Sequence, residues 1–145
     1  MKAKTFLGRA YRLDLKINTK LEQLEYLRSL AYKVTSALRE DKVQNGGQPK
    51  GTLEDTVIKI VMAEQAVNDE IDKFIAVKNE IEDMLRLIAN DDQRLLLELR
   101  YLCFNSWEQI AVKLHISGSY VYQLHRQALD SFDSVLAMQR RYADA

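Results

Sequence analysis

The sequence has little of what β-rich or disulfide-bonded proteins need. One proline and five glycines in 145 residues leave few turn positions, which predicts a mostly helical chain. Cys103 is the single cysteine, so one chain can form neither a disulfide nor a cysteine-rich zinc site, and we expect Cys103 to pack as a small buried hydrophobe. No apolar run is long enough to span a membrane or to form a signal peptide. We therefore expect a cytoplasmic protein.

Charge cancels over the whole chain but is unevenly distributed. Residues 1–50 hold eleven Lys and Arg against five Asp and Glu, residues 51–90 hold four against nine, and residues 91–145 hold six against seven. The basic side chains near the N-terminus form either an arm for DNA phosphates or a solvated face paired with the acidic middle segment; they are Lys2, Lys4, Arg9, Arg12, Lys16 and Lys20. Because basic residues supply most non-specific DNA affinity, the last segment is weakly equipped to bind DNA alone.

Two long stretches place apolar residues at alternating steps of three and four, the spacing of a coiled-coil seam. The first seam comprises Leu13, Ile17, Leu24, Leu27, Ala31, Val34 and Leu38, and Leu21 and Leu30 widen its stripe. Helix breakers gather between the stretches and predict a loop at 41–51, with a second helix starting at Thr52. The second seam comprises Val57, Ile60, Glu64, Val67, Ile71, Phe74, Lys78, Ile81, Leu85 and Ile88.

Two such helices joined by a short loop most simply fold back as an antiparallel hairpin. The loop position sets a register in which three oppositely charged pairs face one another: Arg28 with Glu64, Asp14 with Lys78, and Lys20 with Asp72. The alternative is parallel self-association of each helix across a dimer. We expect residues 1–90 to form a helical hairpin that serves oligomerisation or partner binding.

The last third of the chain, residues 91–145, is predicted to form a separate three-helix domain. Asp91 is a suitable N-cap, and the leucines after it are spaced for one buried helical face; they are Leu95, Leu96, Leu99 and Leu102. Serines precede the next two helices: Ser106 caps Trp107–Leu114, and Ser117 caps a helix that begins there. The fold class is therefore all-α, a long antiparallel hairpin followed by a three-helix domain.

The last two helices fit the helix-turn-helix motif, in which helices cross over a three- to four-residue turn. A small residue is needed at the crossing, and Ala111 stands there. The turn residue with a positive φ is usually glycine; here it is His115, at a cost of about 1 kcal/mol. The core positions of the motif are all apolar: Ile110, Leu114, Ile116, Val121 and Leu124.

The outer face of the helix 117–130 would enter the major groove of DNA. Gln123 can pair with an adenine edge, Arg126 with a guanine edge or a phosphate, and Tyr122 with a phosphate or a thymine methyl. The predicted DNA-binding residues are Ser117, Gly118, Ser119, Tyr122, Gln123, Arg126 and Gln127. The alternative is the solvated face of an ordinary three-helix bundle.

Three segments of this domain resemble region 4 of the sigma-70 family, which reads the −35 promoter element. They are QRLLLELRY at 93–101, WEQIA at 107–111 and SGSYVYQLHRQAL at 117–129. The resemblance implies DNA contacts at Gly118, Ser119, Tyr122, Gln123 and Gln127. Sigma factors usually have basic residues where Gly118 and Tyr122 stand, so the −35 specificity is not implied. Sigma region 2 has no counterpart here, and promoter opening by this chain alone is not implied either.

The whole chain, a long hairpin before a sigma-like domain containing YVYQLHR at 120–126, resembles small phage proteins of the ArpU/RinA type. That resemblance implies a late-gene transcription regulator in the cytoplasm of a bacterial host. It implies double-stranded DNA as the partner. The hairpin would then either contact RNA polymerase or form a homo-oligomer, most simply a dimer.

The sequence shows no motif for catalysis, metal binding or cofactor binding. It has no phosphate-binding glycine loop, nucleophile elbow or zinc motif, and His115 and His125 do not have a zinc-ligand spacing. We therefore expect a non-enzymatic, sequence-specific DNA-binding transcription regulator without metal or cofactor. Two alternatives stay open: a DNA-packaging protein of the small-terminase type, and a sigma-like adaptor that binds protein rather than DNA.

Overall fold

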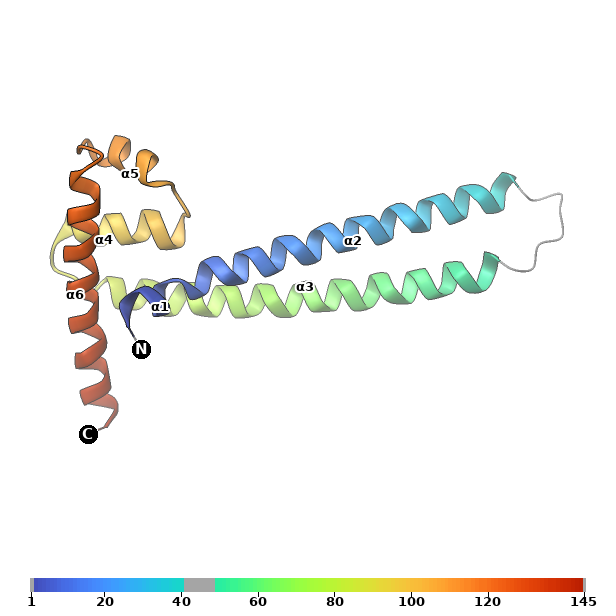
Figure 1. Cartoon of the computed structure of the whole chain (residues 1–145). Helices are drawn as coiled ribbons and strands as arrows, with labels where there is room; N and C mark the ends of the chain where they lie inside the picture. Colours follow the sequence, from blue (N-terminus) through green and yellow to red (C-terminus); the bar gives the residue numbers. More distant parts are fainter. Residues whose placement is uncertain (1, 41–48, 145) are drawn as a thin grey trace. The chain divides into compact units, whose positions relative to one another are not determined.

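The computed structural model describes residues 2–40 and 49–144, and within these ranges it contains helices and no strand (Figure 1). The elements are α1 (Ala3–Leu7), α2 (Arg9–Glu40), α3 (Pro49–Leu85), α4 (Asp91–Leu97), the π-helical turn η1 (Glu98–Leu102), α5 (Trp107–Leu114) and α6 (Tyr120–Ala143). The predicted all-α class is confirmed. Across the described ranges, no helix has the length and apolar character needed to cross a lipid bilayer.

The chain divides into two compact units, and both long helices contribute to each of them. The head unit comprises Met1–Leu13 and Phe74–Ala145, and the hairpin unit comprises Asp14–Lys73. This division differs from the boundary expected between residues 90 and 91. The reason is that apolar side chains from the first ten residues and from the end of α3 pack into the same core as α4, α5 and α6.

In the hairpin unit α2 and α3 run antiparallel, as Figure 1 shows. Arg28 Nη2 lies 3.0 Å from Glu64 Oε1, which confirms the antiparallel arrangement and the predicted register. Lys20 and Asp72, both described, form no ion pair within 4.0 Å. The seam residues Ile17, Leu24 and Val67 are the buried ones among the described residues of this unit. Two helices alone leave the rest of their apolar stripes partly open, and Leu21 and Val57 are exposed.

Helix α3 begins at Pro49, three residues before the expected start at Thr52. Proline is favoured in the first turn of a helix, because the N–H group that it lacks would have no helical partner there and its fixed φ suits the helix. The expected loop at 41–51 is therefore too long at its C-terminal end. Its remaining residues, 41–48, lie outside the described ranges.

The core of the head unit includes the first residues of the chain, which the sequence analysis did not predict. Ala3, Phe6, Leu7 and Ala10 are buried, at a spacing that forms one face across α1 and the start of α2. The Phe6 ring lies 5.6 Å from the ring of Phe132 in α6, and the Ala3 N–H donates a 2.8 Å hydrogen bond to the Asp133 carboxylate. Helix α1 is thus an integral part of the head unit.

The start of α4 corrects one predicted cap. Asn90, not Asp91, is the N-cap residue, and its side-chain oxygen accepts a 3.0 Å hydrogen bond from the Gln93 N–H. Asp91 is instead the first helical residue, where its carboxylate pairs with Arg94 and suits the positive end of the helix dipole.

The π-turn η1 corrects the predicted buried face of this helix. Leu96 and Leu97 are fully buried, whereas Leu95 is 36% exposed. In η1 the Cys103 N–H bonds to the Glu98 carbonyl, five residues back. The wider turn shifts the residues after it from their α-helical positions. Tyr101 is therefore buried, and Cys103, expected in the core, ends the turn facing solvent.

Candidate nucleic-acid interface

The first helix of the helix-turn-helix, α5, is fixed at its start by a capping box. The Gln109 N–H donates to Ser106 Oγ at 3.2 Å, and the Ser106 N–H donates to Gln109 Oε1 at 2.8 Å. These bonds satisfy two backbone donors that the first turn leaves without helical partners. Ile110 and Ala111 face inward and are buried. The predicted cap at Ser106 and the predicted small residue at the crossing are both confirmed.

The turn between the two helices has the left-handed residue that the motif requires. His115 has φ 56° and ψ 44°. Its N–H bonds to the Val112 carbonyl at 3.2 Å, and the Ile116 N–H bonds to the Ala111 carbonyl at 3.0 Å. This bond pattern is a Schellman motif, which ends a helix and normally has glycine at the position of His115. The predicted positive φ is confirmed, and the exposed imidazole has no packing role that offsets its strain.

Replacing His115 by glycine should stabilise the protein. Glycine adopts a positive φ without a Cβ clash, and we expect His115→Gly to raise the free energy of unfolding by about 0.5–1 kcal/mol. Urea unfolding followed by circular dichroism measures the change. His115→Ala is the matched control because it removes the imidazole and keeps Cβ. Equal stabilisation by both substitutions would show that the imidazole, not the backbone conformation, is unfavourable.

Helix α6 is the second helix of the motif, the one expected to contact DNA. Ser117 Oγ accepts a 3.0 Å hydrogen bond from the Tyr120 N–H, and the Ser117 carbonyl accepts one from the Val121 N–H at 3.2 Å. The Ser117 side chain therefore caps the first turn as predicted, although Ser119 is the residue directly before the regular helix, which runs from Tyr120 to Ala143 and so extends well beyond the segment 117–130 expected to enter DNA.

The structure places all seven predicted DNA-binding residues on the solvent side of the motif. Val121, Leu124 and Ala128 form the buried face of α6, and the predicted residues lie opposite or in the turn, each exposed: Ser117, Gly118, Ser119, Tyr122, Gln123, Arg126 and Gln127. A Cβ added at Gly118 would meet no atom within 4 Å, so the site has room for a larger side chain. These seven residues, called the reading face below, are thus free to meet a partner, as the sequence predicts for a DNA contact.

Behind this face lies a buried polar and aromatic cluster that the sequence analysis missed. Tyr101 Oη lies 2.7 Å from Nε2 of His125 in α6, and His125 is only 9% exposed. The Trp107 ring lies 4.5 Å from the His125 ring and 5.5 Å from the Tyr122 ring. The Arg100 guanidinium stacks over Trp107 at 4.3 Å. The cluster joins η1, α5 and α6, and it holds Tyr122 of the reading face against Trp107.

Burial, followed by the positive charges of Lys4, Arg100 and Arg126, lowers the pKa of His125 to about 4. Burial also raises the pKa of Tyr101. Near neutral pH, His125 is therefore an uncharged ring, and its Nε2 can accept the hydrogen bond that the Tyr101 hydroxyl donates. The bonded pair of Tyr101 and His125 is therefore uncharged, and the charged groups that act on His125 are the cations Lys4, Arg100 and Arg126.

Residues 33–133 match a family model described as "Protein of unknown function (DUF1492)". The match covers more than half of the chain. The chain belongs to the DUF1492 family. The matched region includes most of the hairpin unit and the helix-turn-helix, whereas α1 lies outside it. No curated protein and no solved structure matches the chain.

The head unit of this DUF1492 protein is more basic than its C-terminal third. Met1–Leu13 together with Phe74–Ala145 hold twelve Lys and Arg against ten Asp and Glu, whereas residues 91–145 alone hold six against seven. Of the N-terminal basic residues, Arg9 pairs with Glu80 of α3 at 3.0 Å, as expected for a face paired with the acidic helix. Lys4 instead lies close enough to His125 for its charge to affect that pKa.

Proposed function

We propose that this DUF1492 protein is a non-enzymatic, sequence-specific DNA-binding transcription regulator of the ArpU/RinA type, encoded by a phage or prophage. The start of α6 enters the major groove. The observation that supports this most strongly is the exposed face of α6 directly after a left-handed helix-turn-helix turn. Polar side chains at Ser119, Tyr122, Gln123, Arg126 and Gln127 share this face, and the packing of the core does not need any of them.

The chemistry of this face suits base recognition. Gln123 offers the donor and acceptor pair that matches an adenine edge, and Arg126 offers the two parallel donors that match guanine. Neither has a protein partner within hydrogen-bond distance among the described residues, so DNA does not have to displace one. Tyr122, packed against Trp107, is already ordered and loses little side-chain entropy on binding.

The hairpin unit supplies avidity to a domain that is weakly charged for DNA binding. Several of its large apolar side chains are exposed, with Tyr26 at 64%, Tyr32 at 75% and Met62 at 63%, as expected for a surface that meets another protein. We propose a homodimer, with RNA polymerase as the alternative partner. A symmetric dimer binds paired half-sites about 10 bp apart or at a multiple of that spacing, and linkage of two sites raises the effective affinity.

Selection of bound fragments from the genome that encodes the protein, at two salt concentrations, tests the proposal. We expect enrichment of a common sequence, and a loss of about 5- to 150-fold in specific affinity for Gln123→Ala and for Arg126→Ala, because each bidentate base contact contributes about 1–3 kcal/mol. Gln139→Ala and Arg140→Ala are matched controls, since both residues are exposed on the same helix beyond the motif. These controls should bind like the wild type.

The outcomes separate the proposal from its alternatives. No enrichment at low salt contradicts DNA binding and favours the adaptor that binds protein. A ring-sized mass in analytical ultracentrifugation favours a packaging protein of the small-terminase type. If the same sequence is still enriched by Gln123→Ala and by Arg126→Ala, the proposed regulator function stands, but the base contacts are assigned to the wrong residues.

A further inference from the structure

Three basic side chains from different elements converge on the buried cluster behind the reading face. Lys4 comes from α1, Arg100 from η1 and Arg126 from α6, and all three lower the pKa of His125 by their charge, with no acidic group opposing them. Within the described residues, no carboxylate oxygen lies within 4.0 Å of any of the three.

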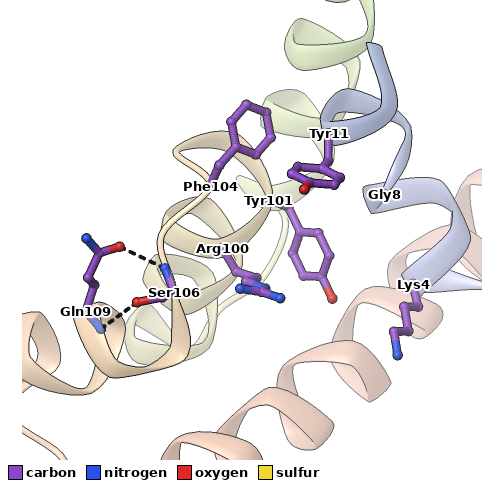
Figure 2. A pocket seen from close by; sticks show the side chains of 8 residues that line it. All are labelled: Lys4, Gly8, Tyr11, Arg100, Tyr101, Phe104, Ser106 and Gln109. Carbon is purple, nitrogen blue, oxygen red and sulfur yellow. Dashed lines mark hydrogen bonds between the residues drawn. The ribbon is translucent and has the colours of Figure 1, made fainter. Parts of the chain in front are cut away.

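A pocket of about 430 Å³ lies between two of these cations. Figure 2 shows Lys4 and Arg100 on either side of Tyr101, with Ser106 and Gln109 beyond Arg100. Arg100 donates one hydrogen bond, from Nη1 to the Asn105 carbonyl at 3.0 Å, and keeps further N–H donors. The Lys4 side chain is exposed, and its ammonium group makes no hydrogen bond to any of the described residues. The hydroxyl of Tyr101 is already bonded to His125, so the charged groups of the pocket are the two cations Lys4 and Arg100, beside the aromatic rings of Tyr11, Tyr101 and Phe104.

These charges lie beside the helix that we propose enters DNA. The charges of all three cations lower the pKa of His125, and His125 directly precedes Arg126 of the reading face. A protein that places a recognition helix in the major groove must also fix its position by contacts to the phosphates that border the groove. Lys4 and Arg100 are two cations whose charge reaches His125 of α6 although neither belongs to that helix.

We propose that Lys4 and Arg100 bind a backbone phosphate of the same DNA duplex whose major groove receives α6, so that the N-terminal helix α1 is part of the DNA interface. This inference rests on the proposed function. It also supplies the positive charge that residues 91–145 lack, because α1 packs against α6 through Phe6 and Phe132 and thereby places Lys4 beside the motif.

The salt dependence of binding to a duplex of random sequence tests this contact with the full-length chain. Each phosphate neutralised contributes about 0.9 to the slope of log affinity against log salt concentration. We expect Lys4→Gln to reduce that slope by about one and to weaken binding at low salt by about three- to tenfold. Lys16→Gln is the control, since Lys16 is an exposed lysine of α2 in the hairpin unit, and it should leave the slope unchanged.

A second variant covers the other cation of the pocket. Arg100→Gln should lower the slope as Lys4→Gln does, and Arg100→Lys, which keeps the charge, should restore it. Thermal unfolding of both variants separates this effect from loss of the Arg100 contact with Trp107. A slope lost equally in the glutamine and lysine variants would overturn the role of Arg100 as a charge for phosphate.

The remaining outcomes also decide the question. If Lys4→Gln does not change the salt dependence of DNA binding while Gln123→Ala still loses specific binding, this inference is overturned and the proposed function stands. Equal losses for Lys4→Gln and Lys16→Gln overturn it too, because they indicate a general charge effect. Absence of DNA binding by the wild type overturns both proposals. If Lys4→Gln abolishes binding of inorganic phosphate but does not change the salt dependence of DNA binding, the pocket is a site for a free anion, and the proposed DNA contact is overturned.

Discussion

Phe132→Ala is expected to lower the free energy of unfolding by about 3–5 kcal/mol, because it removes a large fully buried side chain and leaves a cavity. Phe132 lies at the centre of the head-unit core, where its ring is 5.6 Å from that of Phe6. This ring contact and the hydrogen bond from the Ala3 N–H to Asp133 both join α1 to α6. Urea unfolding followed by circular dichroism measures the loss.

Two further substitutions serve as a control and as a test of the partner ring. Met138→Ala changes an exposed residue of the same helix and should shift stability by no more than about 0.5 kcal/mol. Phe6→Ala removes the partner ring on α1. Phe6 is also buried, so this substitution should lower the free energy of unfolding by about 3–5 kcal/mol, as for other buried phenylalanines. A Phe6→Ala protein as stable as the wild type would contradict the placement of α1 in the core.

Lowering the pH should destabilise the wild type relative to His125→Gln. The pKa of His125 is about 4 in the folded protein, against 6.5 as its ordinary value. Between these values the unfolded chain binds a proton that the folded protein does not, so stability falls as the pH falls. The contribution is complete above pH 6.5 and is lost by about pH 4, and a shift of this size corresponds to about 3 kcal/mol.

The comparison with His125→Gln isolates this histidine, because the carboxylates titrate in both proteins and the glutamine does not titrate. Glutamine also keeps an acceptor for the Tyr101 hydroxyl. Urea unfolding at a series of pH values between 7 and 4 should show the two stabilities approaching each other by about 3 kcal/mol as the pH falls. Curves that stay parallel over this range would show that His125 is not buried as a neutral ring. An NMR titration of its imidazole gives the pKa directly.

The buried pair of Tyr101 and His125 also bears on the proposed recognition of DNA. His125 is next to Arg126, and Trp107 contacts both His125 and Tyr122. Protonation of His125 would place a charge in a site surrounded by Lys4, Arg100 and Arg126. The packing that orders the reading face is therefore most secure near neutral pH, where His125 is uncharged.

The sequence by itself determined the features that depend on residues close together in the chain. The capping of α5 by Ser106 and Gln109 and the left-handed turn at His115 follow from hydrogen bonds that reach no more than five residues. The exposed face of α6 follows from helical periodicity. The pairing of Arg28 with Glu64 was also predictable, because a short loop and a repeating seam leave few registers in which charges match.

The tertiary structure alone decided which distant segments share a core. The Ala3 N–H bonds to Asp133, 130 residues away, and the spacing of apolar residues within a segment does not specify the partner against which that segment packs. Ala3, Phe6, Leu7 and Ala10 have the spacing of one helical face, but that spacing does not indicate that the face packs against α6. Likewise, one extra residue in η1 turned Tyr101 inward and Cys103 outward. A π-turn is stabilised by the packing around it and has no local signal as strong as a helix cap, so the cluster of Tyr101 and His125 became visible only in the folded protein.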